Sequence, residues 1–497
     1  MTAATQKLRF WIDMALECVR RDHTPQLSPG DQKGPFLTAR ALGMALAALN
    51  DANAYASSRS PLLNLPATPG LVPTPGNPVD SDIASAAACA QVLRLRYPNQ
   101  ANLLEPAWLH WLEYFELGKP GSSAEMSGRA FGTAVHNFGS ADVANAAADQ
   151  YIPSQELYTH VVSPSQLSQG YAGAKWGSST PLLATRITDF PPPPGRISAS
   201  VVNPTQHYAD DFAKVAIKGD VNRPIGQPGI RTLQEEVIGI AWAYDGPPEL
   251  GTPPRLYLQI VLTILDEIEA RTTSTLTFVD ELEIIAGVGI AMADAAIDAW
   301  FYKYAPTHMM WRPAVGIRKA EAGNGVADPD WLPLGSPATN GSNFNQTPNF
   351  PSYPSGHATF GAAAFQLLRL FLTEKGVATF YADGIDDVSF DFVSDEFNGR
   401  NKDPRTLQPR DRLTLAHTSL WQAIIDNSVS RVYLGVHWQF DGVTTRNSTG
   451  TDDEFGVPSS PSVLGKIGGV WLGAQIANQI ALKLGVNSAT INASKVL

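Results

Sequence analysis

Apolar residues recur at helical spacing over most of the chain. Residues 8–21 (LRFWIDMALECVRR) and 36–56 (FLTARALGMALAALNDANAYA) show the pattern near the start, and the second of them is rich in small residues. Further helical patterns span residues 82–97, 231–246, 254–270, 280–304, 357–376, 414–435 and 465–485. No part of the chain alternates strands with helices as an α/β fold would. The pattern predicts a mostly α protein built from helical bundles, with two four-helix bundles as the expected arrangement.

Proline and glycine mark long loops between these helices. Residues 59–80 are too rich in both for any helix or strand interior, and 191–195 read PPPPG. Residues 186–232 are therefore expected to be long loops with one small hairpin. We expect an N-terminal helical half (1–230) and a C-terminal helical half (231–497), which together form one compact unit.

Composition and charge narrow the function. Charged residues make up 17% of the chain, against the usual quarter, and the net charge is −11. Such a charge argues against nucleic acid or an anionic membrane as a partner. Asp13 and Glu17 interrupt the apolar residues near the start, and no uninterrupted 18-residue apolar run follows. We therefore expect no signal peptide, no membrane span and, by default, a cytoplasmic protein.

Only two cysteines are present, Cys18 and Cys89. They are too few for a disulfide scaffold or a cysteine-based metal cluster. Because both fall in segments with a helical pattern, we expect buried free thiols.

Three short stretches in the last 200 residues carry the candidate chemistry. The first is Lys303 followed by Trp311-Arg312-Pro313, and the second is Pro354-Ser355-Gly356-His357. The third is Ser430-Arg431 with His437 and Asp441 after it, spaced Arg–x5–His–x3–Asp. Each stretch alone is common, as a turn, a helix stop or a core histidine. Together they supply cationic donors for an oxyanion and two histidines for chemistry.

Each residue type suits an anion pocket. Ser355 and Gly356 open a predicted helix, whose first N–H groups and positive dipole end favour an anion. Arg312 and Arg431 supply planar forks for oxyanion oxygens, and Lys303 ends a helix from which its long stem can reach the same centre. Gly435 is expected to end the helix of Arg431.

These three stretches resemble the signature shared by vanadium-dependent haloperoxidases and type 2 phosphatidic acid phosphatases. That signature reads Lys-x6-Arg-Pro, Pro-Ser-Gly-His and Ser-Arg-x5-His-x3-Asp. The second and third parts match in full, whereas eight residues, not six, separate Lys303 from Arg312. No other lysine lies between residues 272 and 302, so Lys303 is the candidate.

The resemblance implies vanadate as the cofactor, with vanadium at +5, and hydrogen peroxide and a halide as substrates. His437 would bond vanadium, and His357 would act as the acid–base. Lys303 would make the bound peroxide oxygen electrophilic. Asp441 would orient a group near the histidine loop. The cofactor oxygens would be held by Lys303, Arg312, Ser355, Gly356 and Arg431.

Two other functions stay open. An acid phosphatase of the same superfamily would use His437 as its nucleophile, and a non-enzymatic helical protein could bind phosphate or sulfate in the same pocket. The chain length, the 72 residues between His357 and Ser430 and the absence of predicted membrane helices favour the haloperoxidase. A pure binder has no use for two histidines.

Trp300 and Phe350 match places where haloperoxidases put halide-pocket side chains, although ordinary core packing explains them equally well. Phenylalanine rather than histidine at 350 leans towards bromide together with chloride. Organic acceptors are a further class of substrate. The sparse charge and apolar helices leave room for a homo-oligomer.

Overall fold

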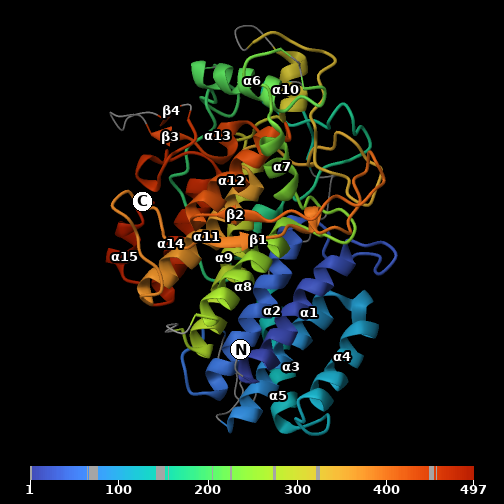
Figure 1. Ribbon diagram of the computed structural model, residues 1–497, viewed down its shortest axis with the longest axis vertical. Coiled ribbons are helices and arrows are strands. Elements are labelled where there is room, and N and C mark those ends of the chain that lie inside the picture. Colours follow the sequence, from blue (N-terminus) through green and yellow to red (C-terminus); the bar gives the residue numbers. More distant parts are fainter. Residues whose placement is uncertain are drawn as a thin grey trace.

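The computed structural model describes residues 3–63, 65, 76–140, 151–154, 156–203, 205–223, 226–271, 276–320, 325–446, 453–454 and 456–496. These residues are mostly helical, as predicted, and Figure 1 shows the helices grouped in bundles. The N-terminal helices are α1 (Ala3–Asp22), α2 (Pro35–Ala56), α3 (Pro78–Arg96), α4 (Ala101–Tyr114) and α5 (Ser123–Gly139). The central helices are α6 (Gln206–Lys218), α7 (Leu233–Ala241), α8 (Pro253–Glu269), α9 (Phe278–Tyr304) and α10 (Pro313–Lys319). The C-terminal helices are α11 (Gly356–Glu374), α12 (Leu420–Tyr433), α13 (Gln439–Gly442), α14 (Gly469–Lys483) and α15 (Ser488–Ala493).

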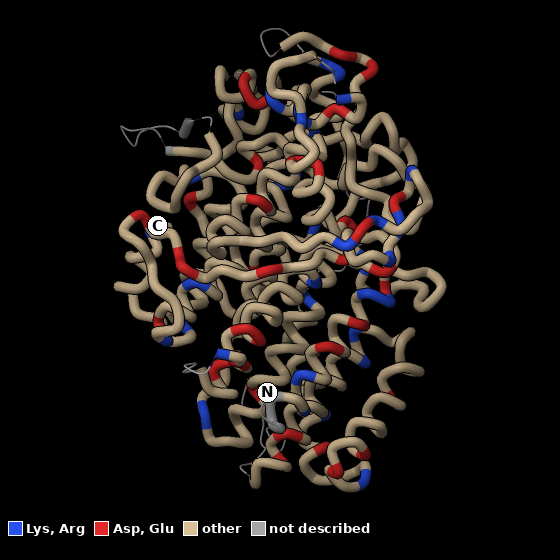
Figure 2. Tube along the Cα trace, viewed as in Figure 1, with Lys and Arg blue, Asp and Glu red and all other residues tan. Residues whose placement is uncertain are grey.

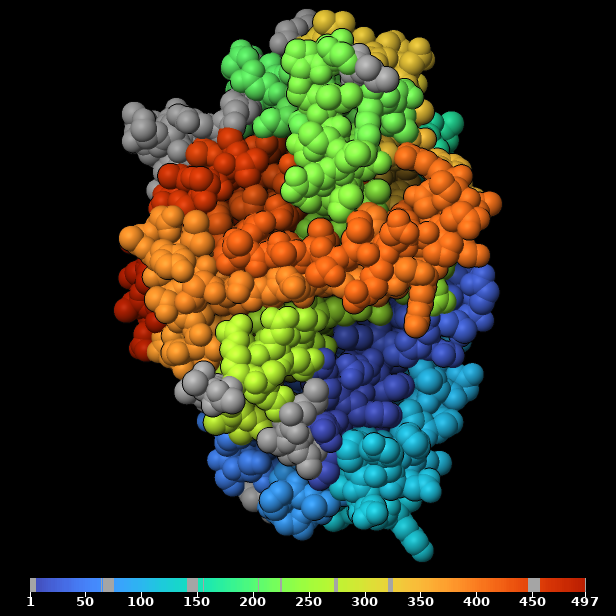
Figure 3. Space-filling model, viewed as in Figure 1, coloured from blue at the N-terminus to red at the C-terminus, as the bar shows by residue number. Residues whose placement is uncertain are grey.

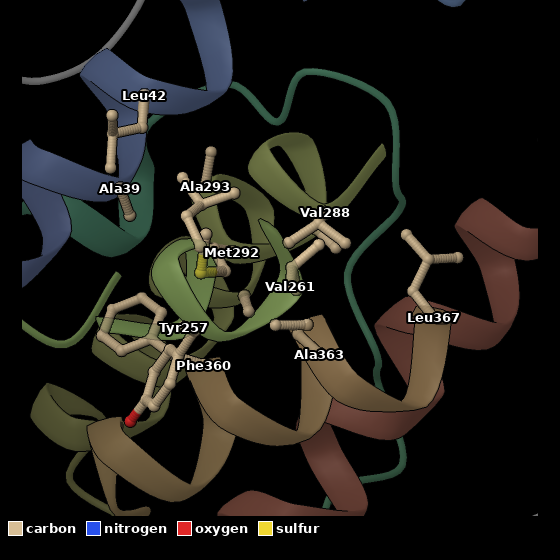
Figure 4. Close-up of a cluster of buried hydrophobic side chains, with 14 of the residues drawn as sticks. Ala39, Leu42, Tyr257, Val261, Val288, Met292, Ala293, Phe360, Ala363 and Leu367 are labelled. Carbon is tan, nitrogen blue, oxygen red and sulfur yellow. The ribbon is translucent and has the colours of Figure 1, made fainter. Parts of the chain in front are cut away.

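Helix α9 lies at the centre and joins two groups of helices. It packs on α2, which also contacts α3 and α5, and on α11 and α14 of the C-terminal half. Figure 4 shows side chains of α2, α8, α9 and α11 meeting in one core cluster. Small residues allow the close approach of α2 and α9: a Cβ built on Gly43 would lie 2.8 Å from the backbone oxygen of Gly289.

The apolar length of α9 is explained by its central position. This helix is long and apolar enough to cross a membrane by length and composition, but 94% of its most apolar window is buried inside the protein. Its N-terminus is closed by a capping box between Thr277 and Asp280. Such a helix belongs to a large core.

Two buried carboxylates on α9 hold the loop that follows the N-terminal bundle. Asp294 accepts hydrogen bonds from the backbone N–H groups of Leu182, Leu183 and Ala184, at 2.6 to 2.9 Å. One turn later, Asp298 accepts a hydrogen bond from Ile187 N–H at 2.9 Å. The loop is therefore fixed along the helix that ends at Lys303.

Strands are few and short in the part of the chain that the structure describes. The antiparallel pair β1 (Phe390–Phe392) and β2 (Leu415–His417) crosses one face, and β3 (Thr445–Arg446) pairs with β4 (Asp453–Glu454). In Figure 3 the segment after α11, coloured orange, forms a belt over that face, between the green segment and the N-terminal helices. Figure 2 shows the sparse charge of the chain: charged residues are scattered, with long uncharged stretches between them.

The expectation of loops throughout residues 186–232 is wrong in part. A short antiparallel bridge does join Arg196 and Val202, but residues 206–218 form α6. This helix has an apolar face with Tyr208 and Phe212, and the Thr205 hydroxyl caps its start. Cys18 and Cys89 are buried free thiols, as predicted.

Candidate active site

Helix ends and loops of the C-terminal half bring the predicted site residues together. Lys303 lies in the last turn of α9, and Arg312 directly precedes α10. Ser355 caps α11, with Gly356 and His357 in its first turn. Arg431 lies near the end of α12, and Gly435, with φ +69°, turns the chain towards His437. Listed in chain order, the buried members are Lys303, Arg312, Ser355, His357, Arg431, His437 and Asp441.

His437 is held in one orientation by Asp441. Its Nδ1 lies 2.9 Å from the Asp441 carboxylate, and its Nε2 lies 2.9 Å from Nη1 of Arg312. Burial, with Arg312 and Lys303 nearby, holds the pKa of His437 well below its ordinary value. A neutral ring that donates from Nδ1 to Asp441 keeps a lone pair on Nε2. His437 therefore presents an unprotonated nitrogen beside a cation.

Asp441 is a buried carboxylate with several donors on one oxygen. Besides His437, its Oδ2 accepts hydrogen bonds from Trp438 N–H at 2.9 Å and from the Ser352 hydroxyl. Its Oδ1 is buried without a partner. Burial raises the pKa of Asp441 to about 7, against the opposing effects of Ser352, Arg312 and Lys303.

The two arginines leave buried donors free. Arg312 donates to the carbonyls of Phe350 (3.0 Å) and Val436 (2.9 Å), yet its Nη2 has no partner. Nη2 of Arg431 bonds both carboxylate oxygens of Asp245, at 3.0 and 2.9 Å, and its Nε and Nη1 have no partner. Unpaired buried donors of this kind are costly. An oxyanion bound between the arginines would satisfy them, so the donor set fits such a group.

The Lys303 ammonium contacts the loop before α11. Its ammonium is fully buried and donates to the backbone carbonyls of Pro351 (2.9 Å), Ser352 (3.1 Å) and Pro354. Burial and the charge of Arg312 lower the pKa of Lys303 well below its ordinary value. The lysine thus shapes the loop before α11, and contact with an anion requires it to exchange one of these carbonyls.

His357 is a neutral base held from two sides. Its Nε2 lies 2.6 Å from the Ala243 carbonyl and 3.9 Å from an Asp245 oxygen. Burial and the charge of Arg431 lower the pKa of His357 to about 3, although Asp245 opposes this. Because Nε2 donates to the Ala243 carbonyl, Nδ1 carries the lone pair. The backbone carbonyl of His357 accepts from Tyr257 and Asn427, which fixes the first turn of α11.

Trp300 and Phe350 form an aromatic wall at the site. Their ring centroids are 4.7 Å apart, and the Lys303 ammonium lies 5.5 and 5.1 Å from them. A Cβ built on Gly356 would lie 3.4 Å from the Trp300 ring. Both rings therefore lie beside the predicted cofactor residues, in range of cation–π contact with Lys303.

A cavity of about 220 Å³ opens onto these residues. Its lining includes the site residues His357, His437, Gly356, Asp245, Trp300 and Phe350. Residues from the N-terminal half and from loops also line it, namely His23, Lys33, Gly34, Pro35, Gln169, Gln346, Pro348 and Asn349. Both halves of the chain thus contribute to one cavity.

Two residues of this site were not predicted from the sequence. Asp245 forms an ion pair with Arg431. Burial alone would raise the pKa of Asp245, but Arg431 and His357 together lower it below its ordinary value. Ser352 donates from its hydroxyl to Asp441 and holds Lys303 through its carbonyl. Asp245 lies in the AWAYDG segment, and Ser352 lies two residues before Pro354, but neither belongs to the three-part pattern.

Known proteins resemble this chain in sequence and in fold. The family model "VCPO second helical-bundle domain" matches residues 283–451. The vanadium chloroperoxidase of Curvularia inaequalis is 32% identical over 96% of this chain and 89% of its own length. A bacterial vanadium-dependent iodoperoxidase structure superposes with a TM-score of 0.60 at 17% identity, covering 95% of each chain. The apo form of a bacterial vanadium-dependent chloroperoxidase gives 0.61 at 14% identity, covering 93% of this chain and 96% of its own.

Proposed function

Since this chain belongs to the vanadium-dependent haloperoxidase family, we propose that it holds vanadate and oxidises a halide with hydrogen peroxide. In the overall reaction the halide loses two electrons, the O–O bond of peroxide breaks, and one proton is consumed, giving hypohalous acid and water. One observation carries the proposal. Unpaired guanidinium nitrogens of Arg312 and Arg431 accompany a neutral His437 whose Nε2 keeps its lone pair.

Different residues would bind the vanadium and the oxygens of the cofactor. His437 would bond vanadium through Nε2, because Asp441 keeps the proton on Nδ1. Arg312, Arg431, Lys303, the Ser355 hydroxyl and the Gly356 N–H would hold the oxygens. When bound, vanadate supplies a Lewis-acidic centre that activates peroxide without a change in its oxidation state.

His357 would take the proton of incoming peroxide. Its Nδ1 is unprotonated because Nε2 donates to the Ala243 carbonyl. A base with so low a pKa gains basicity when an anion lies beside it, since the anion offsets the charge of Arg431. Lys303 would then hydrogen-bond the activated oxygen, which makes that oxygen more electrophilic.

Trp300 and Phe350 would form the apolar side of the halide-binding pocket. Both are nearly buried, at 0% and 8% exposed, and both lie within 5.5 Å of the Lys303 ammonium. An apolar wall excludes water and strengthens the polar contacts beside it. We infer oxidation of bromide and, more slowly, of chloride.

Three assays on the same purified protein test the proposal. With vanadate, peroxide and bromide, we expect bromination of a phenol dye, and no bromination once vanadate is left out. Hydrolysis of p-nitrophenyl phosphate without bromination would instead assign an acid phosphatase with His437 as nucleophile. Binding of sulfate or phosphate with neither activity would leave an anion-binding protein.

A further inference from the structure

The cavity extends beyond the predicted cofactor residues. Its volume of about 220 Å³ is many times the 10–15 Å³ or so that a single buried water needs. The rest of its lining includes Lys33, Gly34 and Pro35 of the N-terminal half, Gln169, and loop residues Gln346, Pro348 and Asn349.

The exposure of the lining residues gives the cavity a direction. The aromatic residues Trp300, Phe350 and Phe360 are buried and mark its inner part. Three side-chain amides, Gln169, Gln346 and Asn349, are half-buried, and Lys33 is exposed and marks the mouth. An aromatic ring with a polar substituent matches this order of surfaces.

Lys33 gives the mouth a positive charge. It is exposed and lines the cavity, and among the described residues it takes part in no ion pair. A Cβ built on Gly30, whose φ is +93°, would lie 2.8 Å from the Lys33 ammonium. A side chain at position 30 would therefore collide with the lysine in this position. The lining also contains the Asp245 carboxylate, which pairs with Arg431, and three histidines, His23, His357 and His437, and burial lowers the pKa of each histidine.

On these grounds, and resting on the proposed function, we propose that the cavity binds an aromatic acceptor that carries a carboxylate. The ring would lie against Phe350, which is the most exposed of the three aromatic side chains at 8%, with the carboxylate at Lys33. Halogenation then happens in the cavity: the ring forms a carbon–halogen bond with hypohalous acid, loses a proton, and the oxygen leaves as water. In a chain of net charge −11, Lys33 selects such an anion at the mouth.

A matched pair of phenols tests this directly. The probes are 4-hydroxybenzoate and its neutral methyl ester, and the first measurement is their binding by calorimetry to the protein saturated with vanadate, because without vanadate the carboxylate would also bind the unpaired nitrogens of Arg312 and Arg431. We expect the acid to bind roughly two- to fivefold more tightly than the ester, and the preference to vanish in Lys33→Gln. Lys33→Arg should restore the preference. The matched control is Lys119→Gln, an equally exposed lysine between α4 and α5, which should leave it unchanged.

The second measurement is bromination of the two phenols with vanadate, peroxide and bromide. The ratio of their kcat/KM values cancels any general effect of the charge on halide entrance, and it should fall towards one in Lys33→Gln only. Equal binding of acid and ester to the wild type, or an unchanged preference in Lys33→Gln, overturns this inference. If no bromination occurs at all, the proposed function fails, whereas the binding result still decides whether the acceptor site exists.

Discussion

Replacing Asp441 with asparagine tests how His437 is prepared for its ligand. The carboxylate accepts from His437 Nδ1, from Trp438 N–H and from the Ser352 hydroxyl, all on Oδ2. Asparagine can keep its oxygen towards these donors only if its NH2 takes the place of Oδ1, which has no partner. The substitution therefore keeps the tautomer of His437 but removes the charge and buries an unpaired donor.

The expected size of the effect follows from these contacts. A hydrogen bond to a charged group contributes about 1.5–3 kcal/mol and a neutral one about 0.5–1.5 kcal/mol, so the bond to His437 weakens by about 1–1.5 kcal/mol. The unpaired amide costs a further 1–3 kcal/mol or so of folding stability. Because partners of metal-binding histidines typically contribute 10- to 100-fold to affinity, we expect the vanadate Kd of Asp441→Asn to rise by about that factor.

The assay is a vanadate titration in phosphate-free buffer, with recovery of bromination as the signal and thermal unfolding measured without vanadate. The control is Asp391→Asn, an exposed aspartate in β1. A vanadate Kd equal to that of the wild type in a folded Asp441→Asn protein would refute the orienting role of this carboxylate.

Four further substitutions or titrations extend the account. His357→Ala should lower turnover by about 10²- to 10⁴-fold and change the vanadate Kd less than tenfold; unchanged turnover from pH 5 to 8 would exclude it as the base. Bound sulfate should raise the pKa of His357 above about 3, which histidine ¹⁵N NMR would measure. By linkage, the affinity for sulfate should then increase as pH falls, and an affinity that does not change with pH would contradict this. Phe350→His should lower the ratio of kcat/KM for chloride to that for bromide; a higher ratio would mean that Phe350 only packs in the hydrophobic core. Ser352→Ala should weaken vanadate binding by roughly 2- to 10-fold, and by less in an Asp441→Asn background, because its bond to a neutral amide oxygen is weaker than its bond to the carboxylate; an equal effect in both backgrounds would contradict this.

Local sequence rules were enough for the helices that carry the site. The apolar pattern of residues 280–304 predicted α9, and the Ser355-Gly356 pair predicted the start of α11. Gly435 predicted the end of the helix with Arg431, but the predicted start at residue 414 is wrong, because residues 415–417 form β2 and α12 begins at Leu420. These features depend on capping and periodicity, which are written in neighbouring residues.

The partners of the site residues depend on tertiary structure and could not be predicted in this way. Asp245 reaches Arg431 from 186 positions away, and Lys33 reaches the cavity from the N-terminal half. Nor did the sequence indicate that the Lys303 ammonium donates to three carbonyls of the loop before α11, one of which it must exchange to contact an anion. Helix α6 was missed, although its apolar spacing and the Thr205 cap were readable, because the surrounding proline-rich stretch dominated the interpretation.

The central claim is that one vanadate per chain, held at His437, makes this protein a halide-oxidising enzyme. The most direct measurement is the titration of vanadate into vanadate-free protein while bromination of a phenol dye by peroxide and bromide is followed, in the wild type and in His437→Ala. We predict that wild-type activity appears only with vanadate and saturates at about one equivalent, while a folded His437→Ala binds vanadate weakly and stays inactive. Bromination without vanadate, or normal activity of His437→Ala at saturating vanadate, would contradict the claim.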